Sequence, residues 1–104
     1  FILIEVQGNR EAIGYGDDFE KVTFKTIELP IFKNDIIYSY TDGYPDQFGG
    51  PRNKKFGSKR FKKLLLSIHH LNMNEQKQEL DKTFYKWKGE QENLDDVLVM
   101  GVRV

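Results

Sequence analysis

The C-terminal segment of the chain constrains its fold more than any other. Residues 97–104, VLVMGVRV, form a nearly continuous apolar run that is rich in valine and too short for a good helix. Such a run is typical of a buried β-strand. The sequence therefore predicts a sheet that is closed by this last strand.

Three earlier segments also have the composition of strands. Residues 1–6 are short and rich in β-branched side chains, and residues 22–29 alternate apolar and polar side chains, as in a strand with one solvent-exposed face. Residues 35–41 are partly apolar on both faces, which indicates a more interior position in the sheet. The long loop that follows, residues 44–57, is rich in Gly, Pro, Asp, Asn and Lys. Because it is longer than ordinary connections, we expect it to have a function.

Two helices are expected between this loop and the last strand. Ser58 can cap the first, whose apolar residues recur at helical spacing on one face: Phe61, Leu64, Leu65, Ile68 and Leu71. The second begins near Asn74, ends at Gly89 and buries three side chains: Leu80, Phe84 and Trp87. The order βββααβ predicts an α+β domain with both helices on one face of the sheet.

The composition excludes several classes of protein. With 104 residues the chain has room for one domain with one core. The absence of cysteine excludes disulfides, thiolate zinc sites and cysteine nucleophiles. Equal numbers of basic and acidic residues, 16 of each, disfavour a nucleic-acid partner. No apolar run approaches the roughly 20 residues of a spanning helix, so we do not expect this segment to insert into a membrane.

Two acidic motifs lie at strand ends. Asp42-Gly43 follows the strand at residues 35–41, but the dipeptide is also the commonest signature of a tight hairpin turn, and alone it favours that structural interpretation. Asp95-Asp96 precedes the last strand, where adjacent carboxylates either bind a cation or form a solvated strand start. Pairing of the two strands would aim carboxylates from both motifs at one point, as hard divalent cations prefer.

Two other polar clusters have simpler explanations. Between Arg52 and Lys63 there are seven basic residues and no acidic one, which could attract a phosphorylated substrate or a nucleic-acid backbone. A solvated helix face is the preferred interpretation, because the apolar residues of that helix already define a buried stripe. His69 and His70 are adjacent, so on a helix they point about 100° apart and cannot form a metal-binding pair one turn apart.

Four segments together resemble a known family. They are residues 35–43 (DIIYSYTDG), residues 44–50 (YPDQFGG), residues 55–57 (KFG), and Asp95-Asp96 before a terminal β-run that ends VRV. In this order and spacing they are similar to the C-terminal part of the phosphatase domain of sporulation stage II protein E. That family (SpoIIE) is the bacterial branch of the PPM, or type 2C, metal-dependent serine/threonine protein phosphatases. Residues 12–14 (AIG) also resemble a Pro-Ile-Gly segment common before the penultimate strand of the family.

The resemblance covers nearly the whole chain and implies both a fold and a site. It implies that residues 1–104 are the C-terminal portion of one domain, a partial α/β-β-α sandwich with a mainly antiparallel sheet. In the family, the aspartate of a Ser/Thr-Asp-Gly motif and the first aspartate of a terminal Asp-Asn or Asp-Asp motif bind the metals. These residues correspond to Asp42 and Asp95. Gly43 and Asp96 would lie behind the ligands, and Leu98 stands where threonine is frequent.

The implied reaction is the hydrolysis of phosphoserine or phosphothreonine in a phosphoprotein. Two Mn²⁺ or Mg²⁺ ions would hold a bridging water, whose lowered pKa supplies hydroxide for in-line attack. No residue beyond the metal ligands is expected to be catalytic, and the sequence identifies no substrate-binding residue. The alternative is a phosphatase-like domain without catalytic activity, used for binding or regulation.

The family's other metal ligands lie upstream, in an acidic strand and an Asp-Gly-x-Gly-His segment, and nothing in residues 1–43 matches them. The chain also starts inside an apolar run, at Phe1. We therefore expect a fragment that lacks the N-terminal half of its domain, binds metal weakly, is inactive alone and self-associates through an open sheet edge. The complete protein is expected to be a cytoplasmic signalling output module, or the cytoplasmic domain of a membrane-anchored sensor.

Overall fold

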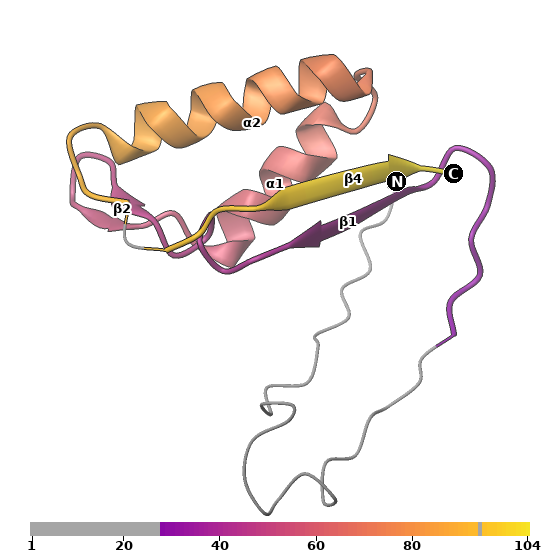
Figure 1. Ribbon diagram of the computed structural model, residues 1–104, viewed down its shortest axis with the longest axis horizontal. Coiled ribbons are helices and arrows are strands. Elements are labelled where there is room, and N and C mark those ends of the chain that lie inside the picture. Colours follow the sequence, from indigo (N-terminus) through magenta and orange to yellow (C-terminus); the bar gives the residue numbers. More distant parts are fainter. Residues whose placement is uncertain (1–27, 94) are drawn as a thin grey trace, which may run out of the picture.

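The computed structural model describes residues 28–93 and 95–104, and Figure 1 shows how their helices and strands are arranged. The elements are β1 (Ile36–Tyr40), β2 (Phe48–Gly49), β3 (Lys54–Lys55), α1 (Ser58–Ile68), α2 (Met73–Lys88) and β4 (Val99–Arg103). The strands expected at residues 1–6 and 22–27 lie outside the described residues, as does the segment 12–14. Residues 28 and 29, the end of the second expected strand, belong to no strand.

The main sheet joins segments that are far apart in the sequence. β1 pairs with β4 in an antiparallel register that places Ile37 opposite Val102 and Tyr38 opposite Gly101. Successive side chains of a strand point to opposite faces of the sheet, so the neighbours Ile37 and Tyr38 of β1 lie on different sides. The predicted α+β class with an antiparallel sheet is confirmed.

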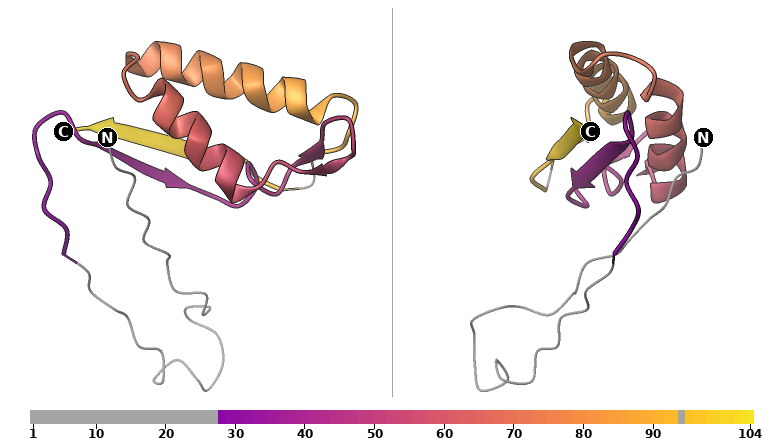
Figure 2. Two further views of the ribbon diagram at one scale, coloured as in Figure 1. Left: turned by 180° about the vertical axis from the view of Figure 1, so that it is seen from behind. Right: turned by 90° about the vertical axis from the view of Figure 1, so that its right-hand side faces the viewer.

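Both helices cover one face of the β1–β4 pair (Figure 2). On that face, four half-buried side chains pack against the core: Tyr38, Tyr40, Val97 and Val99. The other face is apolar and exposed, with Ile37, Leu98, Met100 and Val102 between 47% and 56% accessible. The prediction of a buried last strand is therefore wrong: Val99 is half buried and the other four residues of β4 are exposed, because no described element forms a second layer on the far face.

The core lies between this sheet and the two helices. Its buried apolar side chains come from the 44–57 loop and both helices: Tyr44, Phe56, Phe61, Leu65, Ile68 and Phe84. Tyr44 is central, with ring centroids 5.5 Å from Phe56, 4.9 Å from Phe61 and 5.0 Å from Phe84. These tilted and edge-on geometries are the favourable ones for aromatic pairs. Tyr44 also donates a hydrogen bond to the carbonyl of Leu80, at 2.7 Å.

The helices begin and end close to the expected positions. Ser58 is the first helical residue of α1 and makes no capping bond, since Gly57 occupies the capping position. Asn72 caps α2 by accepting a bond from the Glu75 amide at 2.8 Å, so this helix begins just before the expected Asn74. Gly89 ends it as expected, with φ of 54°. In the described part of the chain, neither helix is long and apolar enough to cross a bilayer.

The 44–57 loop is folded onto the C-terminal end of α2. It contains a short hairpin in which Phe48 pairs with Lys55 and Gly49 with Lys54. A Cβ built on Gly49 would lie 2.6 Å from the carbonyl carbon of Trp87, so the hairpin backbone touches the helix end directly. The Trp87 indole donates to the carbonyl of Gln47 at 3.0 Å. Trp87 is thus half buried under the loop rather than at the centre of the core.

The turn between α1 and α2 is tied to the sheet by polar side chains. The buried Gln76 accepts a bond from the Tyr38 hydroxyl at 2.6 Å and donates to the carbonyl of Leu71 at 2.9 Å. Arg103 donates to the carbonyls of His69 and Leu71, both at 2.9 Å. Burial raises the pKa of Tyr38, while the positive charge of Arg103 opposes that rise.

The buried Tyr44 should make the fold sensitive to alkaline pH. Burial, and secondarily the Asp81 carboxylate, raise the pKa of this phenol well above its ordinary value of 10. Above about pH 10 the unfolded chain loses this proton while the folded chain keeps it. The free energy of unfolding should therefore fall by up to about 1.4 kcal/mol per pH unit.

Urea unfolding of the wild type and Tyr44→Phe between neutral pH and pH 11 measures this effect. Near pH 7 the variant should lose about 1 kcal/mol with its hydrogen bond to Leu80. Above pH 10 its stability should decline less steeply than that of the wild type. If the free energy of unfolding fell equally steeply with pH in the two proteins, Tyr44 would not be the source of this pH dependence.

Candidate functional site

The two acidic motifs meet at one end of the β1–β4 pair. Asp42 follows the end of β1, and Asp95 precedes the start of β4. The pairing of these strands continues past their ends, since the Thr41 amide donates to the carbonyl of Leu98 at 3.0 Å. The antiparallel register is therefore what brings residues 41–43 and 95–98 together.

Thr41 links the two motifs through its side chain. Its hydroxyl donates to the carbonyl of Asp96 at 2.7 Å and accepts a bond from the Leu98 amide at 3.1 Å. A β-branched residue such as threonine is ordinary at the end of a strand. The sequence alone therefore does not identify Thr41 as the link between the two motifs. The only signal for Thr41 is its place immediately before Asp42-Gly43.

Gly43 lies directly against the backbone of the second motif. A Cβ built on Gly43 would collide with the Asp96 carbonyl oxygen and would lie 2.8 Å from its carbon and 3.2 Å from Cα of Val97. These neighbours are backbone atoms, which cannot move aside as a flexible side chain can. Any larger residue would therefore push the two motifs apart.

The hairpin interpretation of Asp42-Gly43 is wrong. β1 pairs with β4, and β2 pairs with β3, so this dipeptide does not connect two paired strands. It starts a local turn instead, in which the Asp46 amide donates to the carbonyl of Asp42 at 2.8 Å. The turn includes the buried Tyr44. Burial of this side chain fixes the position of the turn relative to the core.

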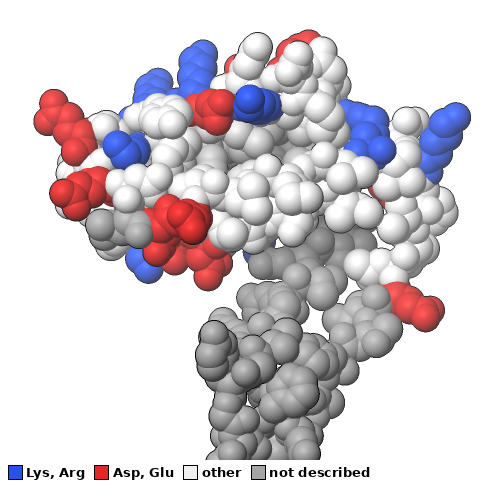
Figure 3. All heavy atoms as spheres, viewed as in Figure 1, with Lys and Arg blue, Asp and Glu red and all other residues white. Residues whose placement is uncertain are grey.

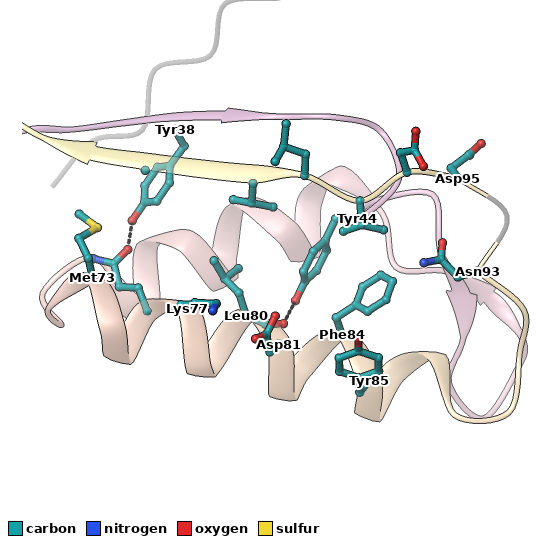
Figure 4. Close-up of a pocket in the computed structure, with 16 residues that line it drawn as sticks. Tyr38, Tyr44, Met73, Lys77, Leu80, Asp81, Phe84, Tyr85, Asn93 and Asp95 are labelled. Carbon is teal, nitrogen blue, oxygen red and sulfur yellow. Dashed lines mark hydrogen bonds between the residues drawn. The ribbon is translucent and has the colours of Figure 1, made fainter.

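The carboxylates of Asp42, Asp95 and Asp96 are exposed. Asp95 and Asp96 also line a groove of about 630 Å³ between α2 and β4, whose walls include Leu80 and Val99. Figure 4 shows Asp95 at one end of this groove and Tyr38 with Met73 at the other. In Figure 3 several acidic side chains lie close together at the end of the molecule where β2 lies, and an uncharged area occupies the middle of the face.

These side chains have the donor chemistry that hard divalent cations prefer, because carboxylate oxygens are the ligands that such ions favour. Within residues 28–93 and 95–104, however, no three acidic or histidine side chains are grouped closely enough to hold a metal ion. His69 and His70 lie in the turn between the helices, away from the acidic motifs (Figure 1). Asp42 and Asp95 therefore remain predicted ligands.

Comparisons with known proteins agree with this architecture. A family model described as Stage II sporulation protein E (SpoIIE) matches residues 4–104. The solved SiaA-PP2C domain of Pseudomonas aeruginosa is similar, with 30% sequence identity and a TM-score of 0.76. The similarity covers 80% of this chain and 34% of that one, so the chain spans about a third of the solved structure. No curated protein matches the sequence.

The contact at Gly43 can be tested by substitution. Gly43→Ala should lower the free energy of unfolding by about 1 to 3 kcal/mol, since the new methyl group must displace the Asp96 backbone. Asp96→Ala is the matched control, because it removes a side chain at the same contact and leaves the carbonyl in place. We expect a change within about 0.5 kcal/mol for the control, as at other exposed positions. Equal losses in urea unfolding would contradict the close approach.

Proposed function

This chain belongs to the Stage II sporulation protein E family, and from that membership we propose that it is part of a metal-dependent phosphatase domain acting on phosphoserine or phosphothreonine in a protein. The observation that supports the proposal best is the contact between the two acidic motifs. Gly43 packs against the Asp96 backbone, and Thr41 bonds to the Asp96 carbonyl. Asp42 and Asp95 are thereby placed on adjoining segments, although 55 positions separate Thr41 from Asp96 in the sequence.

In this proposal Asp42 and Asp95 would hold the Mn²⁺ or Mg²⁺ ions. When bound, such ions lower the pKa of a coordinated water and neutralise negative charge on the phosphate. The surrounding residues fix the ligands: Thr41 ties the segments through its hydroxyl, and Gly43 allows their close approach. Asp96 takes part in this contact through its backbone carbonyl and not through its side chain.

The activity is proposed for the intact protein. Octahedral cations need more oxygen donors than two carboxylates supply, and this chain spans about a third of the solved PP2C domain that it resembles. Further ligands are therefore expected from the rest of the domain. We propose that residues 1–104 alone would bind divalent cations weakly and would not turn over a phosphoprotein.

Substitution of the predicted ligands in the intact protein tests the proposal. With Mn²⁺ and p-nitrophenyl phosphate, Asp42→Ala and Asp95→Ala should each lower kcat/KM by at least about 100-fold, because each removes several kcal/mol of charge stabilisation. Glu90→Gln is the matched control, an exposed carboxylate in the turn after α2, and it should leave kcat/KM unchanged.

Isothermal titration with Mn²⁺ separates the two functional classes. Loss of both cation binding and hydrolysis in the Asp variants supports the metal-centred phosphatase. A wild-type intact protein that binds a phosphoprotein but neither binds cations nor hydrolyses any phosphate monoester would instead support a binding or regulatory domain. Full activity in Asp42→Ala would refute the site assignment.

A further inference from the structure

The basic run from Arg52 to Lys63 has no role in the site described above. No acidic residue occurs between Asp46 and Glu75, whereas the whole chain has 16 basic and 16 acidic residues. The charge of the molecule is thus unevenly distributed along its sequence. The structure divides this run between the β2–β3 hairpin, including its tip, and the first turns of α1.

Four cations of this run have no carboxylate partner among the described residues. Arg52, Lys54, Lys59 and Lys63 are all exposed, and none of them forms an ion pair with a carboxylate of the described residues. A solvated helix face explains Lys59 and Lys63, which lie outside the buried stripe of α1. It does not explain Arg52 and Lys54, because they belong to the hairpin.

The hairpin stands beside the two acidic motifs (Figure 1). The Asp46 amide is bonded to the carbonyl of Asp42, and Lys55 Nζ lies 3.7 Å from Oδ1 of Asp46. On the other side, Gln47 donates to the carbonyl of Glu92 at 3.0 Å, in the segment that leads to Asp95. The base of the hairpin therefore connects the segments that carry both predicted metal ligands.

The hairpin is also held in one position. The Gly50 amide donates to the carbonyl of Trp87 at 2.9 Å, and Arg60 stacks over the Trp87 ring with a distance of 4.7 Å to its centroid. Arg60 in addition donates to the carbonyl of Phe56 at 3.0 Å. A surface fixed in this way loses little conformational entropy when a ligand binds.

We propose that this basic surface, formed by Arg52, Lys54 and Lys59, docks the phosphoprotein substrate and selects segments with Asp or Glu beside the phosphorylated residue. The inference rests on the proposed function. Its basis is charge complementarity at a fixed surface that borders the predicted reaction centre. A long polyanion such as a nucleic acid fits less well, because the exposed carboxylates of Asp42, Glu90 and Glu92 lie on the segments that flank the hairpin.

The test compares two phosphopeptides in the intact protein, one with acidic and one with neutral residues around the same phosphothreonine. Arg52→Glu/Lys54→Glu should lower the ratio of kcat/KM for the acidic over the neutral peptide about tenfold, mainly through KM. Lys33→Glu/Lys82→Glu is the control, with the same change of charge at exposed positions before β1 and on α2. It should leave the ratio unchanged.

Salt provides a second measurement. The wild-type preference for the acidic peptide should shrink as ionic strength rises from about 0.1 M to about 1 M, where the Debye length falls from about 10 Å to about 3 Å. A ratio unaffected by the hairpin substitutions, or lowered equally by the control pair, would overturn the proposal. Hairpin-dependent binding to phosphatidylserine vesicles, without a peptide preference, would also overturn it in favour of a membrane surface.

The docking surface and the phosphatase function can be tested separately. If the wild-type protein hydrolyses p-nitrophenyl phosphate but shows no preference between the peptides, the phosphatase function is supported and the docking surface is refuted. If it hydrolyses no phosphate monoester, peptide binding is measured directly by fluorescence anisotropy. Tighter binding of the acidic peptide that is lost in Arg52→Glu/Lys54→Glu would then support docking without catalysis, and equal binding of both peptides would refute it.

Discussion

The anchoring of Tyr44 in the aromatic core is the interaction on which the remainder of this structure depends. Its ring contacts Phe56, Phe61 and Phe84, which come from the loop and from both helices. Because Tyr44 follows Asp42 and Gly43 directly, its burial also fixes where the chain turns after β1. One side chain thus joins the packing of the helices to the geometry of the candidate site.

A second constraint is the backbone contact between the end of β1 and the start of β4. Antiparallel pairing brings the end of β1 to the start of β4, and Thr41 extends that pairing with its hydroxyl. The close approach at Gly43 then leaves no room for a side chain between the motifs. The carboxylates themselves are exposed, so their positions are determined by the backbone and not by packing around them. Such a site can be completed by ligands from another part of the protein.

Much of the fold could be predicted from the sequence, because periodic apolar residues determine which helix faces are buried. The stripe Phe61, Leu65 and Ile68 is an example. The hairpin at residues 48–55 could not be predicted in this way, since strands of two residues have no periodicity to detect. Its position depends on Gly49 and Gly50 fitting against Trp87, which is a contact between segments distant in the sequence. The pairing of the acidic motifs was predicted, whereas the hydroxyl of Thr41 that joins them was not.

The packing of the hairpin on Trp87 has a practical consequence. The chain contains a single tryptophan, and its indole touches Gly50, bonds to Gln47 and lies under the guanidinium of Arg60. Its fluorescence therefore comes from one defined environment, at the junction of α2 with the basic hairpin. Residues 1–104 thus contain a natural optical reporter for movement or occupancy of this surface, and no added label is needed to observe it.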